Sequence, residues 1–143
     1  MNTCELTFVV QSTGPGLHLT VKIDDTIVYD GFPGENPEKI SYSFDDSVES
    51  DHSLSFEMSG KLPEHTTVSE AGTILRDRVI KISEISFDGI VLGPIFTDQN
   101  QYHHDFNGTQ PATVGKFYGD MGCNGTVVLK FRTPIYLWLL ENM

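Results

Sequence analysis

The sequence predicts an all-β protein, an antiparallel β-sandwich or jelly roll with about nine strands and little helix. Three observations support this fold class. Apolar and polar residues alternate over many short stretches, Gly, Pro and Asp cluster between these stretches, and few segments show a helical period. The chain has 143 residues, enough to bury a core without disulfide or metal staples, so we expect a single domain over residues 1–143.

The first half of the chain contains the clearest strand patterns. Residues 17–23 alternate most cleanly, with apolar residues on one face and polar residues on the other. Asp24 and Asp25 follow, and Asp tolerates the left-handed backbone of a hairpin turn. Residues 59–73 have no sustained period and are predicted to be a long connection with room for one helical turn. The strands expected here cover residues 4–10, 17–23, 26–29, 40–44 and 52–59.

Residues 74–87 are predicted to be extended but irregular. The apolar residues of this segment change parity after Ile82. A one-residue slip moves side chains to the opposite face of a strand, so we expect a β-bulge near residues 83–84. The Asp-Gly pair at 88–89 then predicts a tight hairpin before a short strand at 90–92.

Residues 93–125 form the longest stretch without a clear period. A loop of this length in a compact domain is uncommon, and its aromatic residues argue against disorder, so we expect it to be functional. The β-branched residues of 126–132 predict another strand. The apolar run 134–140 is predicted to be a further strand, locked into the core or into a partner, because a free chain end is usually polar and frayed.

The charge of the chain limits its partners. Lys and Arg number 9 against 20 Asp and Glu, which gives a net charge of −11. This charge repels phosphates, so we expect neither nucleic acid nor an anionic membrane surface as a partner. The N-terminus lacks the basic and apolar regions of a secretion signal, and no apolar window is long enough to span a membrane. Cys4 and Cys123 stand at opposite ends of the chain and are expected to be buried free thiols.

Three carboxylates within residues 93–125 are candidate metal ligands. Asp98, Asp105 and Asp120 lie beside carbonyl-rich Gly and Asn positions, and calcium is the metal that such oxygen ligands favour. No EF-hand spacing occurs, so this expectation depends on composition. The alternative is that these Asp residues form turns and keep the protein soluble.

A ligand-binding set is expected in the same stretch. A sugar has an apolar C–H face and a rim of hydroxyls, which aromatic side chains, amides and carboxylates together match. His103 and His104 point to opposite faces of an extended segment, so we expect only one of them to join a given site. Ordinary core and rim packing is the alternative. The residues expected to contact a ligand are Tyr102, His103, Asp105, Asn107 and Tyr118.

Catalytic signatures are missing from the sequence. It contains no G-x-S-x-G, H-E-x-x-H, P-loop or G-x-G-x-x-G motif. Any acidic protein offers pairs of carboxylates, so such pairs do not indicate a glycosidase. We therefore expect a protein that is not an enzyme.

Two parts of the sequence resemble known families. The block KFYGDMGCNGTVVLKFRTPIYLWLLENM, with FDGIVLG and YHHDFNG before it, resembles small proteins of tailed phages that infect marine cyanobacteria. This resemblance assigns no activity but implies a phage origin and a location in the virion or the host cytoplasm. The hairpin LHLTVKIDDTIVYDG and the Asp-rich late loops are similar to calcium-dependent xylan-binding modules of jelly-roll type, which implies glycan binding assisted by calcium.

Two hypotheses follow. In the first, the chain is a non-enzymatic, carbohydrate-binding-module-like phage protein, a virion accessory that contacts host-surface glycans with the help of Ca²⁺. In the second, it is a purely structural decoration or tail protein that binds other virion proteins or forms a homo-oligomer. The apolar C-terminal run motivates the second hypothesis, because a strand can be donated to a partner sheet.

Overall fold

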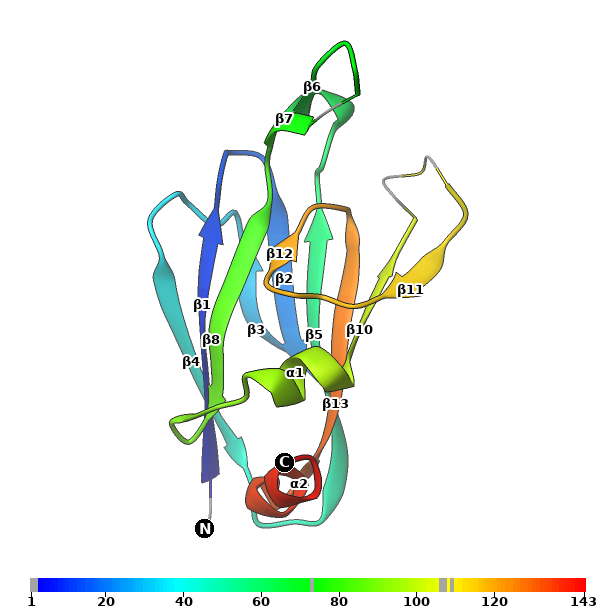
Figure 1. Cartoon of the computed structure of the whole chain (residues 1–143). Helices are drawn as coiled ribbons and strands as arrows, with labels where there is room; N and C mark the ends of the chain where they lie inside the picture. Colours follow the sequence, from blue (N-terminus) through cyan, green and yellow to red (C-terminus); the bar gives the residue numbers. More distant parts are fainter. Residues whose placement is uncertain (1–2, 73, 106–107, 109) are drawn as a thin grey trace.

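The protein consists of two antiparallel sheets packed face to face, with a small hairpin projecting beyond them (Figure 1). A computed structural model describes residues 3–72, 74–105, 108 and 110–143. The five-stranded sheet has the order β12-β8-β1-β4, with β9 paired to β8, and the six-stranded sheet has the order β11-β10-β13-β5-β2-β3. This architecture confirms the predicted antiparallel sandwich.

The strand bounds show where the prediction of about nine strands fell short. The five-stranded sheet contains β1 (Thr3–Ser12), β4 (Glu38–Asp45), β8 (Ile80–Phe87), β9 (Ile90–Val91) and β12 (Asp120–Met121). The six-stranded sheet contains β2 (His18–Ile23), β3 (Thr26–Gly31), β5 (Ser50–Ser59), β10 (Asn100–His104), β11 (Thr113–Gly115) and β13 (Gly125–Thr133). The projecting hairpin is β6 (Thr66–Val68) with β7 (Ile74–Asp77). Of the strands that the sequence did not predict, β6, β11 and β12 have two or three residues, too few for a period to be visible.

The core lies between the two sheets and follows the alternation of the sequence. Phe8 on β1 meets Phe56 on β5 across the sandwich, edge to face, with ring centroids 5.4 Å apart. Burying one such large apolar side chain contributes about 1.5–3 kcal/mol. The other fully buried members include Leu6, Leu19, Leu54, Ile80, Phe87, Val127 and Leu129.

The local turn chemistry is as predicted. Asp24, in the hairpin between β2 and β3, has a φ of 53°, and Asp88 and Gly89 between β8 and β9 have φ values of 50° and 80°. Glu84 has a φ of 54°, and the pairing of β1 with β8 shifts register between Thr7 and Val9. The predicted β-bulge is therefore confirmed, and it explains the change of parity along β8.

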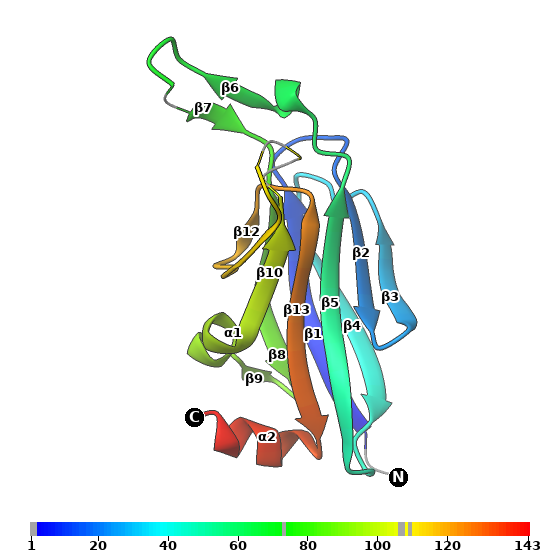
Figure 2. The same ribbon diagram turned by 90° about the vertical axis from the view of Figure 1, so that its right-hand side faces the viewer.

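The C-terminal run is a helix rather than the predicted strand. Helix α2 (Ile135–Glu141) buries Ile135, Trp138 and Leu139, a spacing of three and four residues that only a helix places on one face. The Trp138 ring packs edge to face against Phe87 and Phe131. The helix covers the end of the sandwich opposite the β6–β7 hairpin (Figures 1 and 2). The strand prediction failed because a short apolar run fits either period, and packing onto the core selects the helix.

Residues 93–125 are also more ordered than the predicted long loop. They contain helix α1 (Pro94–Gln99) and the strands β10, β11 and β12. Asn100 is fully buried, and its amide donates to the carbonyls of Phe96 at 2.8 Å and Phe117 at 2.9 Å. Its side-chain oxygen accepts from the Phe117 N–H at 2.9 Å. One asparagine thus ties α1, β10 and the segment before β12 together.

The hairpin β6–β7 leaves the sandwich after a single 3₁₀ turn at Pro63–His65, which matches the helical turn allowed for in that connection. Its base is held by Lys61, whose side chain is 1 % exposed and whose ammonium pairs with Asp77. The ammonium also donates to the carbonyl of Arg78. The projecting element is therefore anchored to the end of β5 by an ion pair between the buried Lys61 and the half-buried Asp77.

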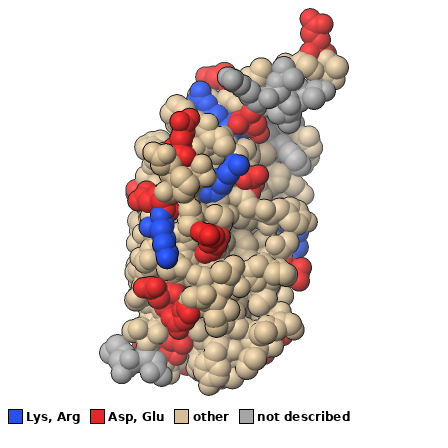
Figure 3. All heavy atoms as spheres, turned by 60° about the vertical axis from the view of Figure 1, so that its left-hand side comes forward, with Lys and Arg blue, Asp and Glu red and all other residues tan. Residues whose placement is uncertain are grey.

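The surface is acidic over its length. Figure 3 shows a face on the side of β4 and β1, where Asp and Glu are spread from end to end with Lys and Arg between them. Within the described part of the chain, no helix has the length and apolar character that a membrane crossing requires.

Candidate functional site

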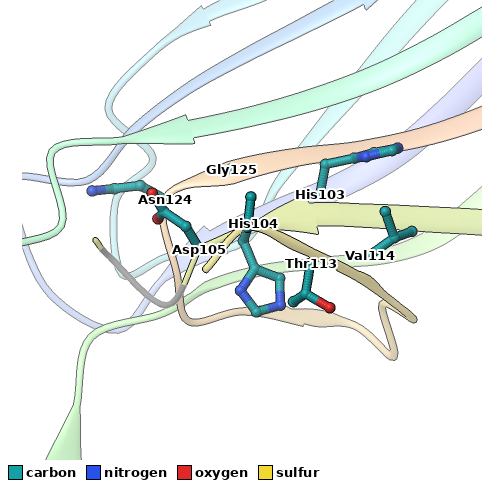
Figure 4. A pocket seen from close by; sticks show the side chains of 8 residues that line it. His103, His104, Asp105, Thr113, Val114, Asn124 and Gly125 are labelled. Atoms are coloured by element: carbon teal, nitrogen blue, oxygen red, sulfur yellow. The ribbon is translucent and has the colours of Figure 1, made fainter. Parts of the chain in front are cut away.

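A pocket of about 520 Å³ lies where β10 ends and β11 and β13 begin (Figure 4). Its described lining comes from three segments that are distant in sequence. They bring two histidines, an aspartate, an asparagine and a threonine together with an exposed valine. The lining residues are His103, His104, Asp105, Ala112, Thr113, Val114, Asn124 and Gly125.

The strand pairing sets the positions of the two histidines. His103 lies opposite Val114 on β11 and Thr126 on β13, whereas His104 lies opposite Thr113 and Gly125. Figure 4 shows the two rings on different sides of β10, as the alternation of a strand requires. Both residues border the pocket, with their rings on opposite sides of β10, and that only one imidazole joins a given site stays a prediction.

Gly125 allows β13 to approach the end of β10 closely. A Cβ built on this glycine would lie 2.2 Å from the carbonyl oxygen of His103 and 2.9 Å from the Cβ of His104. These distances are far below van der Waals contact. Any side chain at position 125 would therefore push the two strands apart and change the shape of the pocket.

Tyr102 supports the pocket from behind. It is 6 % exposed, and its hydroxyl donates to the carbonyl of Cys123 and accepts from the Cys123 N–H at 3.1 Å. Burial raises the pKa of Tyr102 to about 12, so the hydroxyl keeps the proton that it donates. The phenol thus fixes the loop that leads into the lining residues Asn124 and Gly125.

Asn124 is fixed by a second set of contacts. Its side-chain oxygen accepts from the N–H of Lys61 at 2.8 Å, and its amide donates to the carbonyl of Lys61 at 3.2 Å. The pocket wall is therefore connected to the same lysine that anchors the projecting hairpin.

The residues predicted to bind a ligand are only partly brought together. His103 and Asp105 line the pocket, and Tyr102 lies behind it. Tyr118 is 77 % exposed and borders a separate depression of about 230 Å³ near α1 and β8. Asn107 lies outside the described residues.

The three predicted metal ligands are not assembled. Asp98 is on α1, Asp105 follows β10 and Asp120 is on β12. Among the residues that the structure describes, no group of three or more His, Cys, Asp or Glu side chains lies close enough to hold a metal ion. The shared site expected for these three carboxylates is therefore wrong, whereas calcium binding by the protein stays a prediction.

A second pocket, of about 530 Å³, lies toward the other end of β13. The imidazole of His52 faces Asp24 at 2.8 Å and the hydroxyl of Thr133 at 3.1 Å, and it stacks on Phe131 with centroids 5.3 Å apart. The sequence alone did not indicate this group, because its members come from separate turns and strands. Its described lining is Asp24, Asp51, His52, Ser53, Lys130, Phe131, Arg132 and Trp138.

The comparison with known proteins identifies a similar fold. The chain matches no family model and no curated protein. It is similar to a solved structure described as vCBM60 in complex with galactobiose, with 12 % sequence identity and a TM-score of 0.50. The match covers 87 % of this chain and 96 % of the other. At this identity the likeness is one of fold, and the chain shares the β-sandwich architecture of that carbohydrate-binding module.

Proposed function

We propose that this protein is a non-catalytic glycan-binding domain and that the pocket beside β10 is its site. The observation that carries the proposal is the pocket itself, where three segments distant in sequence bring polar residues together beside an exposed valine. The fold supports it, because the similar module was solved with galactobiose bound.

The lining contains apolar and polar groups, divided between the two faces of the β10–β11 pair. Val114, which is 54 % exposed, shares one face with His103, and His104 and Thr113 share the other. The imidazole of His104, the carboxylate of Asp105 and the hydroxyl of Thr113 can exchange hydrogen bonds with ring hydroxyls. Few, well-placed polar groups around an apolar surface are typical of small-molecule sites.

The same lining favours binding over cleavage. Glycoside hydrolysis generally uses two carboxyl groups that flank the scissile bond. Asp105 is the one carboxylate among the described lining residues of this pocket.

The test is a glycan array followed by calorimetry on the best ligand. His104→Ala and Asp105→Asn should each weaken binding about tenfold or more, because each removes a hydrogen bond to the ligand. Tyr118→Ala, at the separate depression, is the matched control and should bind as the wild type does. A wild-type protein that binds no glycan would contradict the proposal.

Calcium assistance and a virion location are further parts of this proposal, and both derive from the sequence resemblances. The calorimetry should therefore be run with calcium and with EDTA. Asp105 would be the carboxylate of the pocket that such an ion contacts. Equal affinity under both conditions would remove calcium from the proposal and leave glycan binding in place.

A structural role through self-association is the second candidate. Tyr136 and Leu140 on α2 are 59 % and 64 % exposed, so the terminal helix still presents apolar side chains. The partner would be a second copy of the chain, bound by the helix rather than by a donated strand. Light scattering that gives a monomer at high concentration would exclude this role.

A further inference from the structure

The outer face of the six-stranded sheet, the face turned away from the other sheet, carries a strip of polar side chains. Neighbouring strands place these residues in rows, because residues opposite one another in an antiparallel pair point to the same face. The residues that alternate with the strip along each strand, such as Val127 and Phe56, point the other way and are buried in the core. The rows are His103–Thr126–Glu57–Thr20, then Gln101–Val128–Ser55–Lys22, then Lys130–Ser53.

The centre of the strip consists of small side chains. Ser53, Ser55, Thr126 and Val128 are all half-buried, and the named rows contain no Phe, Tyr or Trp. A neutral sugar chain would therefore find little ring surface for stacking here. Hydrogen bonds and charge are the interactions that this surface offers.

Two lysines flank the serines. Lys22 on β2 lies opposite Ser55, and Lys130 on β13 lies opposite Ser53. Both lysines are exposed, and neither is within ion-pair distance of a carboxylate among the described residues. The rows contain one carboxylate, that of Glu57, against these two cations, whereas the whole chain has 20 Asp and Glu against 9 Lys and Arg.

Glu57 is the carboxylate within the strip, and the carboxylates of Asp24 and Asp51 beside the strip are already occupied. Asp24 accepts from the ring of His52 at 2.8 Å and from the N–H of Ser53 at 2.9 Å. Asp51 pairs with the guanidinium of Arg132 at 3.3 Å. The ammonium groups of the two lysines are therefore available to an anionic ligand.

We propose that the strip binds an extended anionic polysaccharide, with acidic groups held by Lys22 and Lys130 and hydroxyls by the serines. The inference rests on the proposed function and extends it, because His103 belongs to both the strip and the pocket. From Thr126 to Lys130 the strand runs about 13 Å, so the ligand is longer than a unit that fills the pocket alone. The pocket holds one end of the polysaccharide, and the two lysines of the strip bind acidic groups further along it.

The experiment compares three polymers and a short ligand. Polygalacturonate carries carboxylates, carrageenan carries sulfates, and unmodified galactan is neutral; the short ligand is the best neutral disaccharide from the array. The wild type should bind at least one acidic polymer about tenfold more tightly than neutral galactan, and salt should weaken this preference. The relative affinity of the two acidic polymers identifies whether carboxylate or sulfate is preferred.

The variant K22Q/K130Q should lose this preference while its affinity for the neutral disaccharide stays unchanged. The matched control is K39Q/K81Q, which removes two exposed lysines from the five-stranded sheet. An equal loss in the control would show a general charge effect and overturn the inference. Disaccharide binding without any preference for acidic polymers would overturn the inference alone, whereas no glycan binding at all would overturn the proposed function as well.

Discussion

The phenol of Tyr102 shows how a single buried hydroxyl positions a site that it does not touch. Its two bonds to Cys123 hold the loop between β12 and β13 against β10. That loop leads directly into Asn124 and Gly125 of the pocket. Tyr102 therefore sets the shape of the pocket wall.

Tyr102→Phe should lower the free energy of unfolding by about 1–3 kcal/mol, because it leaves the Cys123 backbone groups without their partner. It should also weaken glycan binding, since the wall residues lose their support. Chemical denaturation and calorimetry measure the two effects. Tyr118→Phe changes the same atom at an exposed position and should change neither; unchanged values for both variants would argue against the supporting role.

The carboxylate of Asp24 gives the protein a pH dependence. Burial alone raises its pKa, but hydrogen bonds from His52 and Ser53 outweigh this effect and hold the pKa below its ordinary value of 3.8. A carboxyl with a lowered pKa stabilises the fold above the unfolded-state value. This contribution is lost as the pH falls through the lower, folded-state value.

Asp24→Asn should therefore remove part of the loss of stability that occurs below about pH 4. Asn keeps the left-handed backbone of the turn, so the change isolates the charge. Thermal unfolding between about pH 2.5 and 7 measures the effect. Asp25→Asn in the same turn is the control, and an identical acid profile for both variants would contradict the role of Asp24.

Helix α2 shows at the scale of an element how packing selects secondary structure. The apolar run around it has enough hydrophobic residues for a strand, but those that reach the core are Ile135, Trp138 and Leu139. Their spacing fits a helix, and Pro134 precedes its first turn. A strand would have placed Tyr136 and Trp138 on the same face, whereas one is exposed and the other is buried.

Trp138→Ala should destabilise the protein by about 3–5 kcal/mol, because it leaves a cavity beside Phe87 and Phe131. Leu140→Ala, at an exposed position of the same helix, should change stability by about 0.5 kcal/mol or less. Urea denaturation of the two variants distinguishes them. Equal, small effects would mean that the helix is not part of the core.

Elements that are defined by residues close together in the sequence were predicted, and elements that depend on contacts distant in the sequence were not. The long strands, the hairpins at Asp24 and Asp88 and the bulge at Glu84 were all predicted, because alternation and turn chemistry are local. Helix α1 and β10 were missed. They are stabilised by the buried Asn100 and by pairing with β13, contacts that no window of sequence contains.

The ion pair of Lys61 connects parts of the whole molecule. Its ammonium holds the base of the β6–β7 hairpin, and its backbone holds Asn124 of the pocket. A buried cation is costly unless it is paired, so removal of either partner leaves an uncompensated group.

Lys61→Met should destabilise the protein by about 1–3 kcal/mol, because the carboxylate of Asp77 and the carbonyl of Arg78 would lose their common partner. Amide hydrogen exchange should become faster in β6 and β7 than in β1 or β5. Lys81→Met, an exposed lysine of the other sheet, is the control. Uniformly faster exchange over all strands would show that the hairpin is not specifically held by Lys61.

Only some of the pocket residues were predicted from the sequence, because the others come from segments that strand pairing brings together. His103 and Asp105 were found because they stand together in an unusual, aromatic and acidic stretch. Thr113, Asn124 and Gly125 come from other segments, and pairing of β10 with β11 and β13 brings them to the same pocket. A glycine at the first position of a strand was the available signal, since it marks a close approach of two backbones.

By itself the sequence determined the sandwich, its hairpins and its bulge, because each depends on residues that are neighbours along the chain. The tertiary structure decided the helical state of the C-terminus, the composition of the pocket and the placing of two serines of β5 between two lysines of neighbouring strands. These features depend on which strands lie side by side, and strand order is set by burial of the whole core rather than by any local pattern.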